Sequence, residues 1–258
     1  MNALVLIDLA FIYKDLKKYI SHIKFLGLIL LVVFLYGFAS QRNSSKSIRD
    51  VRVVFENGDN LFISYETVNK LLIQNLEGDK NQLKENLNLN NLEKFVQSNE
   101  MIENAEIFLT IRGDLGAIIT QRTPVLRIAN SIGSFYYDKQ GIAMPLSDNY
   151  SARVPITTNA FVEDTNSEII CLANLIKNDD FLQKQIIGVK EIKGEGSNQF
   201  ELKTRSGNQT IIFGRLNRVD KKIKKLKVFY QKSMLDSTLN NYKSINLKFN
   251  DQIVCEKY

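Results

Sequence analysis

The sequence has little of the chemistry on which most enzymes depend. Its 258 residues include a single histidine, His22, two cysteines, Cys171 and Cys255, and no tryptophan. The cysteines lie far apart and in no metal-ligand spacing, which argues against a zinc site and against a dense disulfide framework. We expect two free thiols that behave as small apolar residues, and a single structural disulfide is the alternative.

The scarce reactive groups are also badly placed for catalysis. Because His22 borders an apolar segment near the N-terminus, it is not available for Ser-His or Cys-His pairs in the rest of the chain. Paired carboxylates could act as in a glycosidase, but those present lie in polar stretches typical of solvated surface: Glu163, Asp164, Asp179, Asp180 and Glu195. The sequence therefore predicts a protein that is not an enzyme, with no metal, no cofactor and no small-molecule substrate.

One long apolar run stands out. Residues 25–40, "FLGLILLVVFLYGFAS", are uninterrupted by charge, and Lys24 can snorkel to extend the buried length. This pattern predicts one transmembrane helix after a cytoplasmic leader, residues 1–24. A cleaved signal peptide is the competing interpretation, because Gly37 and Ala39 satisfy the small-x-small rule. The long leader has a helical pattern of its own, which favours an uncleaved anchor.

The basic residues that flank this run predict its orientation. Slightly more of them precede the run than follow it, which favours a cytoplasmic N-terminus: Lys14, Lys17, Lys18 and Lys24, against Arg42, Lys46 and Arg49. A net charge of +6 would permit nucleic acid, anionic lipid or an acidic protein as partner. Residues after the anchor would lie outside the cytoplasm, so we expect no nucleic acid partner.

Residues 41–125 are expected to form a polar linker, 41–47, and a small α+β module. A strand begins near Val51, an Asn-Gly turn and a short extended piece follow, and Ser64 is a helix N-cap. A second helix near 89–99 precedes two strands joined by a Gly-Asp turn. The order β-α-α-β-β resembles a POTRA domain, a module that offers sheet edges to other polypeptides.

Residues 126–258 are expected to form an antiparallel β domain with flanking helices. The hairpin "YYDKQGIAMPL" opens it, a helix over about 167–176 and three strands follow, and a closing hairpin ends in a last strand, 252–257. Between them, residues 215–227 hold seven basic residues and one acidic residue above an apolar helical stripe. This basic helix is either a patch for acidic lipid or an acidic partner, or an ordinary solvated face.

Together these features resemble the bacterial cell-division family FtsQ, also called DivIB. The resemblance covers nearly the whole chain, from the basic leader and anchor through the POTRA-like module to the β domain. Arg153 is expected to bind carbonyls or an acid where the two modules meet. The matching residues are Arg122, Pro124, Tyr137, Asp138, Gly141, Met144, Pro145, Leu146, Arg153, Pro155 and Ile156.

The resemblance implies a single-pass inner-membrane scaffold with a cytoplasmic N-terminus and a periplasmic C-terminal domain. Such a scaffold links proteins of the septal division machinery, the divisome, and takes up a strand from FtsB- or FtsL-type partners at its C-terminal edge. A POTRA-containing component of an export or envelope-assembly system is the alternative. The implied partner-binding residues are Phe249, Gln252, Ile253, Val254, Cys255 and Glu256.

Overall fold

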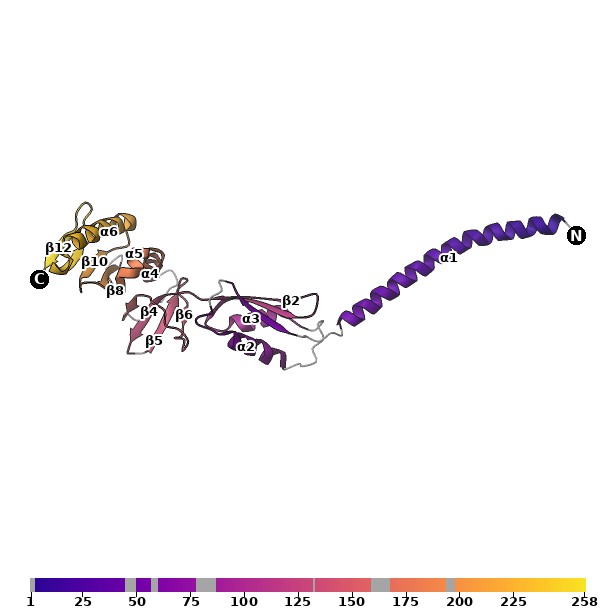
Figure 1. Ribbon diagram of the computed structural model, residues 1–258, viewed down its shortest axis with the longest axis horizontal. Helices are drawn as coiled ribbons and strands as arrows, with labels where there is room; N and C mark the ends of the chain where they lie inside the picture. The colour runs from indigo at the N-terminus through magenta and orange to yellow at the C-terminus, as the bar shows by residue number, and fades with distance from the viewer. Residues whose placement is uncertain are drawn as a thin grey trace.

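The computed structural model describes residues 3–44, 50–56, 60–77, 87–131, 133–158, 168–193 and 198–258. A long N-terminal helix is followed by a three-stranded sheet and then by a nine-stranded sheet, each with its own helices (Figure 1). At this level the expected α+β class is confirmed. The Asn57–Gly58 turn and the carboxylates Glu163, Asp164 and Glu195 lie outside the described residues.

Helix α1, Ala3–Ser44, contains a stretch long and apolar enough to cross a membrane. This stretch is His22–Gln41, twenty residues, somewhat longer than the predicted span of 25–40. At 1.5 Å rise per residue it extends about 30 Å, the thickness of a bilayer's hydrocarbon core. None of it is buried within the protein, unlike the core helix of a soluble domain, so its apolar surface is free to face lipid.

The smaller sheet is formed by β1, Val51–Phe55, β2, Ile102–Leu109, and β3, Leu115–Gln121, in the order β1-β3-β2. Strand β3 pairs parallel with β1 and antiparallel with β2. Helices α2, Tyr65–Glu77, and α3, Leu89–Gln97, pack their apolar residues onto the sheet. Strands and helices thus follow the predicted order β-α-α-β-β.

Local side-chain bonds explain where these elements begin. Ser64 Oγ accepts the N–H of Thr67 at the start of α2, as expected of an N-cap. The extended piece predicted before it is not a strand. Instead, residues 61–63 form bends, and the N–H groups of Phe62 and Ile63 donate to Gln121 Oε1 at 2.9 and 3.0 Å.

The larger sheet has the strand order β12-β11-β10-β9-β8-β7-β4-β5-β6. Three helices accompany its strands: α4, Glu168–Asn178, α5, Asp180–Gln185, and α6, Val219–Leu235. The strands are β4, Pro124–Asn130, β5, Gly133–Asp138, β6, Ala143–Met144, β7, Ile156–Thr157, β8, Ile186–Ile192, β9, Gln199–Thr204, β10, Thr210–Gly214, β11, Tyr242–Asn246, and β12, Val254–Lys257.

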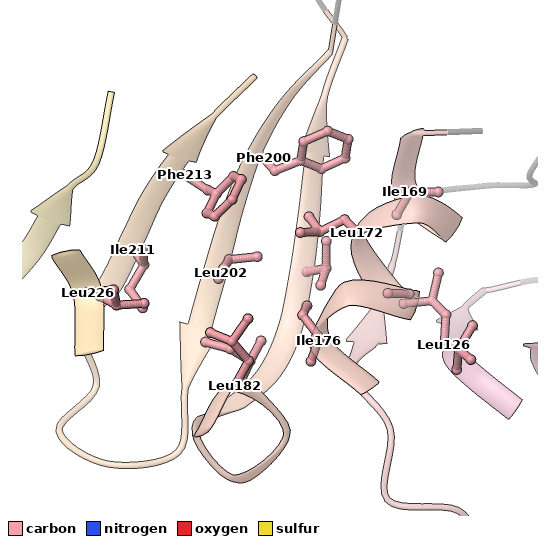
Figure 2. Close-up of a cluster of buried hydrophobic side chains, with 14 of the residues drawn as sticks. Leu126, Ile169, Leu172, Ile176, Leu182, Phe200, Leu202, Ile211, Phe213 and Leu226 are labelled. Atoms are coloured by element: carbon pink, nitrogen blue, oxygen red, sulfur yellow. The ribbon is translucent and has the colours of Figure 1, made fainter. Parts of the chain in front are cut away.

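One face of this sheet carries the main core. Phe200 and Leu202 of β9 and Ile211 and Phe213 of β10 point toward the helices, where Leu226 of α6 meets them (Figure 2). Alternate residues of β9, such as Lys203, lie on the opposite and open face. This alternation is typical of a sheet that packs on one side only, so α4 and α6 share a single apolar layer.

The expectation of a wholly antiparallel β domain is wrong at three pairings. Strands β4 and β7, β7 and β8, and β10 and β11 run parallel. For two of them the physical reason is a crossover helix, because a helix that crosses the sheet between two neighbouring strands returns the chain in the same direction. Helix α6 makes that crossover between β10 and β11, and α4 with α5 makes it between β7 and β8. Between β4 and β7 the chain instead passes through β5 and β6.

A buried ion pair joins the two modules. Arg122, just after β3, donates to Asp138 Oδ2 at 2.7 Å, and the Asp138 side chain is 1% exposed. The N–H groups of Gln140 and Ile142 donate to the other oxygen, Oδ1. The seam arginine is therefore Arg122 and not Arg153, which has no hydrogen bond or ion pair with any residue that the structure describes.

Replacing Arg122 tests this seam. The Arg122→Leu variant leaves the Asp138 carboxylate buried without its cation, which should lower the free energy of unfolding by roughly 3 kcal/mol in urea titrations. The exposed pair between Lys139 and Glu103, 2.8 Å, is the matched control, since Lys139→Ala should cost less than about 1 kcal/mol. Equal losses in the two variants would contradict a structural role for the buried pair.

Candidate functional site

Strand β12 forms one end of the nine-stranded sheet. It pairs antiparallel with β11, and no other described strand pairs with it. The N–H of Tyr258 donates to the carbonyl of Asn241 at 3.2 Å, just beyond the pair Tyr242 and Lys257. In an antiparallel ladder this bond marks Tyr242 and Lys257 as a non-hydrogen-bonded pair.

That geometry decides which backbone groups of β12 are free. Backbone groups alternate in direction along a strand, so Val254 and Glu256 face β11, whereas Cys255 and Lys257 face outward. The outward groups are two N–H donors and two carbonyl acceptors. An arriving strand would find them already aligned for pairing.

The two faces of β12 differ in character. Ile253 and Cys255 pack against the core beneath α6. Both cysteines are free, as expected, and burial raises the pKa of the Cys255 thiol. Cys171 is exposed, so the expectation that both behave as small apolar residues is wrong for Cys171. On the other face Val254 is 42% exposed, and Glu256 lies 3.3 Å from Lys243 of β11. The strand therefore presents one apolar side chain beside an ion pair.

The turn before β12 is held by one lysine of α6. Lys225 Nζ donates to the carbonyls of Phe249 and Asn250 at 2.6 and 3.1 Å. Phe249 lies in this turn, because β11 already ends at Asn246, and the residue is 47% exposed. The helix thereby fixes the point from which β12 starts.

A shallow groove of about 310 Å³ runs between α6 and the turn. Gln252 and Ile253 precede β12 and line one side, while Val228, 60% exposed, and Phe229 line the other. The groove lies beside the start of the open strand. A chain paired with β12 could place an apolar side chain there.

Three of the lysines of α6 bind groups of the protein itself. Lys222 is buried, with Nζ bonded to the carbonyl of Arg215 at 2.7 Å and to Asn217 Oδ1 at 3.0 Å. Lys225 holds the turn, and Lys227 pairs with Asp179 at 2.6 Å. These three lysines support the fold. Neither interpretation of the basic helix, a docking patch or a solvated face, accounts for them.

All six residues implied by the resemblance lie in one place. Phe249 is in the turn, Gln252 and Ile253 border the groove, and Val254, Cys255 and Glu256 are in β12, which begins two residues later than predicted. Their role in binding stays a prediction. Val228, Lys225 and Lys257 were missed. Of these, only Val228 could have been noticed in the sequence, because it is an apolar residue that lies outside the apolar stripe of the predicted helix.

Two other edge strands, β2 and β6, are less open. Along β2, Glu93 Oε1 accepts the N–H of Ile107 at 2.8 Å, and Gln97 Nε2 donates to the carbonyl of Ala105 at 3.1 Å. Two side chains of α3 therefore occupy the backbone groups that a new strand would need. Strand β6 has two residues and ends before Pro145, which has no N–H to donate.

Replacing Lys225 tests how the edge is positioned. In Lys225→Met the carbonyls of the turn lose a cationic donor, so the amides of Val254 and Glu256 should exchange with deuterium about tenfold faster. Lys224→Met is the control, because Lys224 is exposed and contacts none of these carbonyls in the structure. Unchanged exchange in Lys225→Met would show that the turn holds without the lysine.

Lys222 gives a pH prediction. Burial lowers the pKa of its ammonium to about 8, and Arg218 and Lys225 add to the shift. Between about pH 8 and the unfolded value of about 10.4, the unfolded chain binds a proton that the native protein does not. In this window the free energy of unfolding of the wild type, measured by chemical denaturation, should therefore rise more steeply with pH than that of Lys222→Met. The control Lys221→Met should show the same dependence of unfolding free energy on pH as the wild type. If Lys222→Met shows that dependence too, the lowered pKa of Lys222 is contradicted.

Among the residues that the structure describes, no group of three His, Cys, Asp or Glu side chains could hold a metal ion. A family model described as FtsQ/DivIB, C-terminal related, matches residues 123–256, just over half of the chain and the whole nine-stranded sheet except Lys257, the last residue of β12. No curated protein matches significantly. In general this family is a non-enzymatic, membrane-associated scaffold of division. The chain belongs to the FtsQ/DivIB C-terminal related family, which supports a role in cell division.

Proposed function

We propose that this protein is a non-enzymatic scaffold that binds FtsB- or FtsL-type division proteins by strand addition at β12. The observation that carries the proposal is the open edge, where Cys255 and Lys257 direct their backbone groups away from β11. Strand addition uses such groups for affinity and alternate side chains for specificity. The edge offers both.

Specificity would come from the surroundings of the strand. Val254 is exposed on one face, and the groove lined by Val228 and Ile253 lies beside the start of the strand. A partner strand could cover Val254 with an apolar residue on one of its faces and place another, from its opposite face, in the groove, while its backbone pairs with Cys255 and Lys257. Phe249, exposed in the turn, would extend the apolar contact.

The membrane arrangement belongs to the same proposal. The apolar stretch of α1 would anchor the protein in the inner membrane, with the basic leader in the cytoplasm and both sheets in the periplasm. The smaller sheet would act as a POTRA-like module that meets other divisome proteins. Its β-α-α-β-β order supports this assignment.

Proline substitution at Lys257 tests the edge directly. The Lys257→Pro variant lacks one outward N–H but no bond to β11, so the folded sheet should persist. Affinity for the purified periplasmic segment of an FtsB-type partner should fall at least tenfold by calorimetry, from one lost bond and the clash of the ring.

The matched control is Lys257→Ala, which removes the same side chain and keeps the N–H; its affinity should stay within about twofold of wild type. If Lys257→Pro binds as tightly as Lys257→Ala, the partner does not pair with this edge. Val254→Pro cannot replace it, because the N–H of Val254 faces β11 and its loss would disturb the strand itself.

A further inference from the structure

A cavity of about 730 Å³ lies where the two modules meet. The smaller module contributes Leu61, Phe62, Ile119 and Gln121. The remaining walls come from the link after β3, the loop before β7, helices α4 and α5, and the turn after β9. The volume falls in the range of about 300–1,000 Å³ typical of ligand sites.

The lining is strongly cationic. It includes five basic side chains and no acidic one: Arg122, Arg153, Lys177, Lys184 and Arg205. Besides Arg122 in the link, four separate segments of the larger module each contribute one basic residue to the lining of this cavity. Like charges placed together destabilise a fold unless something neutralises them, so the arrangement favours an anionic occupant.

Most of this charge is not neutralised within the described part of the protein. Arg122 pairs with Asp138, and Arg205 Nε donates to the carbonyl of Lys184 at 3.0 Å. The side chains of Arg153, Lys177 and Lys184 have no hydrogen bond or ion pair with a described residue. As far as the described residues go, three cations thus remain for a ligand, together with the terminal nitrogens of Arg205.

The cavity also has apolar and neutral polar walls. Leu61, 41% exposed, and the partly buried Phe62 supply apolar surface together with the exposed Tyr150, whereas Ile119 and Pro124 of the lining are buried. Two buried atoms of the lining, Arg122 Nε and Gln185 Oε1, have no hydrogen-bond partner among the described residues. One is a donor and the other an acceptor, so an anion that has no donor group could satisfy only the first.

We propose that this cavity binds an acidic peptide segment of another protein, with carboxylates facing Arg153, Lys177, Lys184 and Arg205 and apolar side chains against Leu61 and Phe62. A peptide supplies both donors and acceptors along its backbone, as the mixed lining requires. Arginine adds planar, bidentate recognition of carboxylates. The site is separate from β12, because the cavity adjoins β4 and β7, whereas β12 is at the far end of the sheet order.

The test uses the full chain in nanodiscs of zwitterionic phosphatidylcholine and a short fluorescent peptide of glutamate, leucine and glycine. Anisotropy should report saturable binding that weakens with added salt. The same peptide with glutamine in place of glutamate should bind at least about tenfold more weakly, since it has lost its charge. Equal binding of the two peptides would overturn the proposal.

Charge reversal locates the site. The double variant Arg153→Glu and Lys184→Glu should bind the acidic peptide at least about tenfold more weakly. The control is Lys221→Glu combined with Lys224→Glu, the same change of charge at two exposed residues of α6, and it should change affinity by less than about twofold. A circular dichroism melt checks that the double variant is folded. Equal losses in both variants would show that overall charge, not the cavity, binds the peptide.

Two further measurements distinguish the cavity from the β12 edge and a protein segment from a smaller anion. Lys257→Pro should bind the acidic peptide as the wild type does, so failure at β12 and failure at the cavity are distinguishable. Soluble stem peptides of peptidoglycan and inorganic phosphate are the competing ligands. Displacement of the acidic peptide by either one at equal or lower concentration would overturn its assignment to a protein segment.

Discussion

The constraint that organises this protein is that unpaired N–H and C=O groups at a sheet edge are a template for pairing with another chain. The two sheets meet it differently. Side chains of α3 occupy the outward groups of β2, and Pro145 follows the two-residue strand β6. Strand β12 has neither device. Its openness is notable because the same chain protects other edges.

Helix α6 determines where that open edge lies. As the crossover between β10 and β11, it makes those strands parallel and places β12 outermost. Its buried Lys222 fixes the loop before the helix, and Lys225 fixes the turn before β12. Although the sequence suggests a basic surface helix, three of its lysines therefore bind other parts of the fold. Binding at β12 would depend on the contacts of Lys222 and Lys225 as much as on the strand itself.

The sequence predicted the elements better than their pairing. Apolar periodicity located α2, α3, α4 and the strands from β8 to β10, because burial of one face follows directly from residue spacing. It could not reveal the parallel pairings, which depend on which strand each crossover helix returns to. Nor could it reveal that Cys255 and Lys257 point outward, because backbone direction depends on the bulge in β11 that shifts the register.

The cavity at the seam was missed for a similar reason. Arg122, Arg153, Lys177, Lys184 and Arg205 are spread over more than eighty residues of sequence and form no charge run. Only the packing of the two modules brings them together. Asp138, by contrast, belongs to the hairpin "YYDKQGIAMPL", and its burial explains why an aspartate stands there. Its carboxylate ties a turn of one module to the arginine that leaves the other.

An edge of four residues with two outward N–H groups can make few main-chain bonds, and each contributes only about 1 kcal/mol. Such an edge is weak for a partner that diffuses freely. If partner and scaffold are anchored in the same membrane, the second contact becomes effectively intramolecular, with local concentrations that can reach the millimolar range for short linkers. A short edge and a separate cationic cavity can then hold partners together, although neither alone would bind tightly.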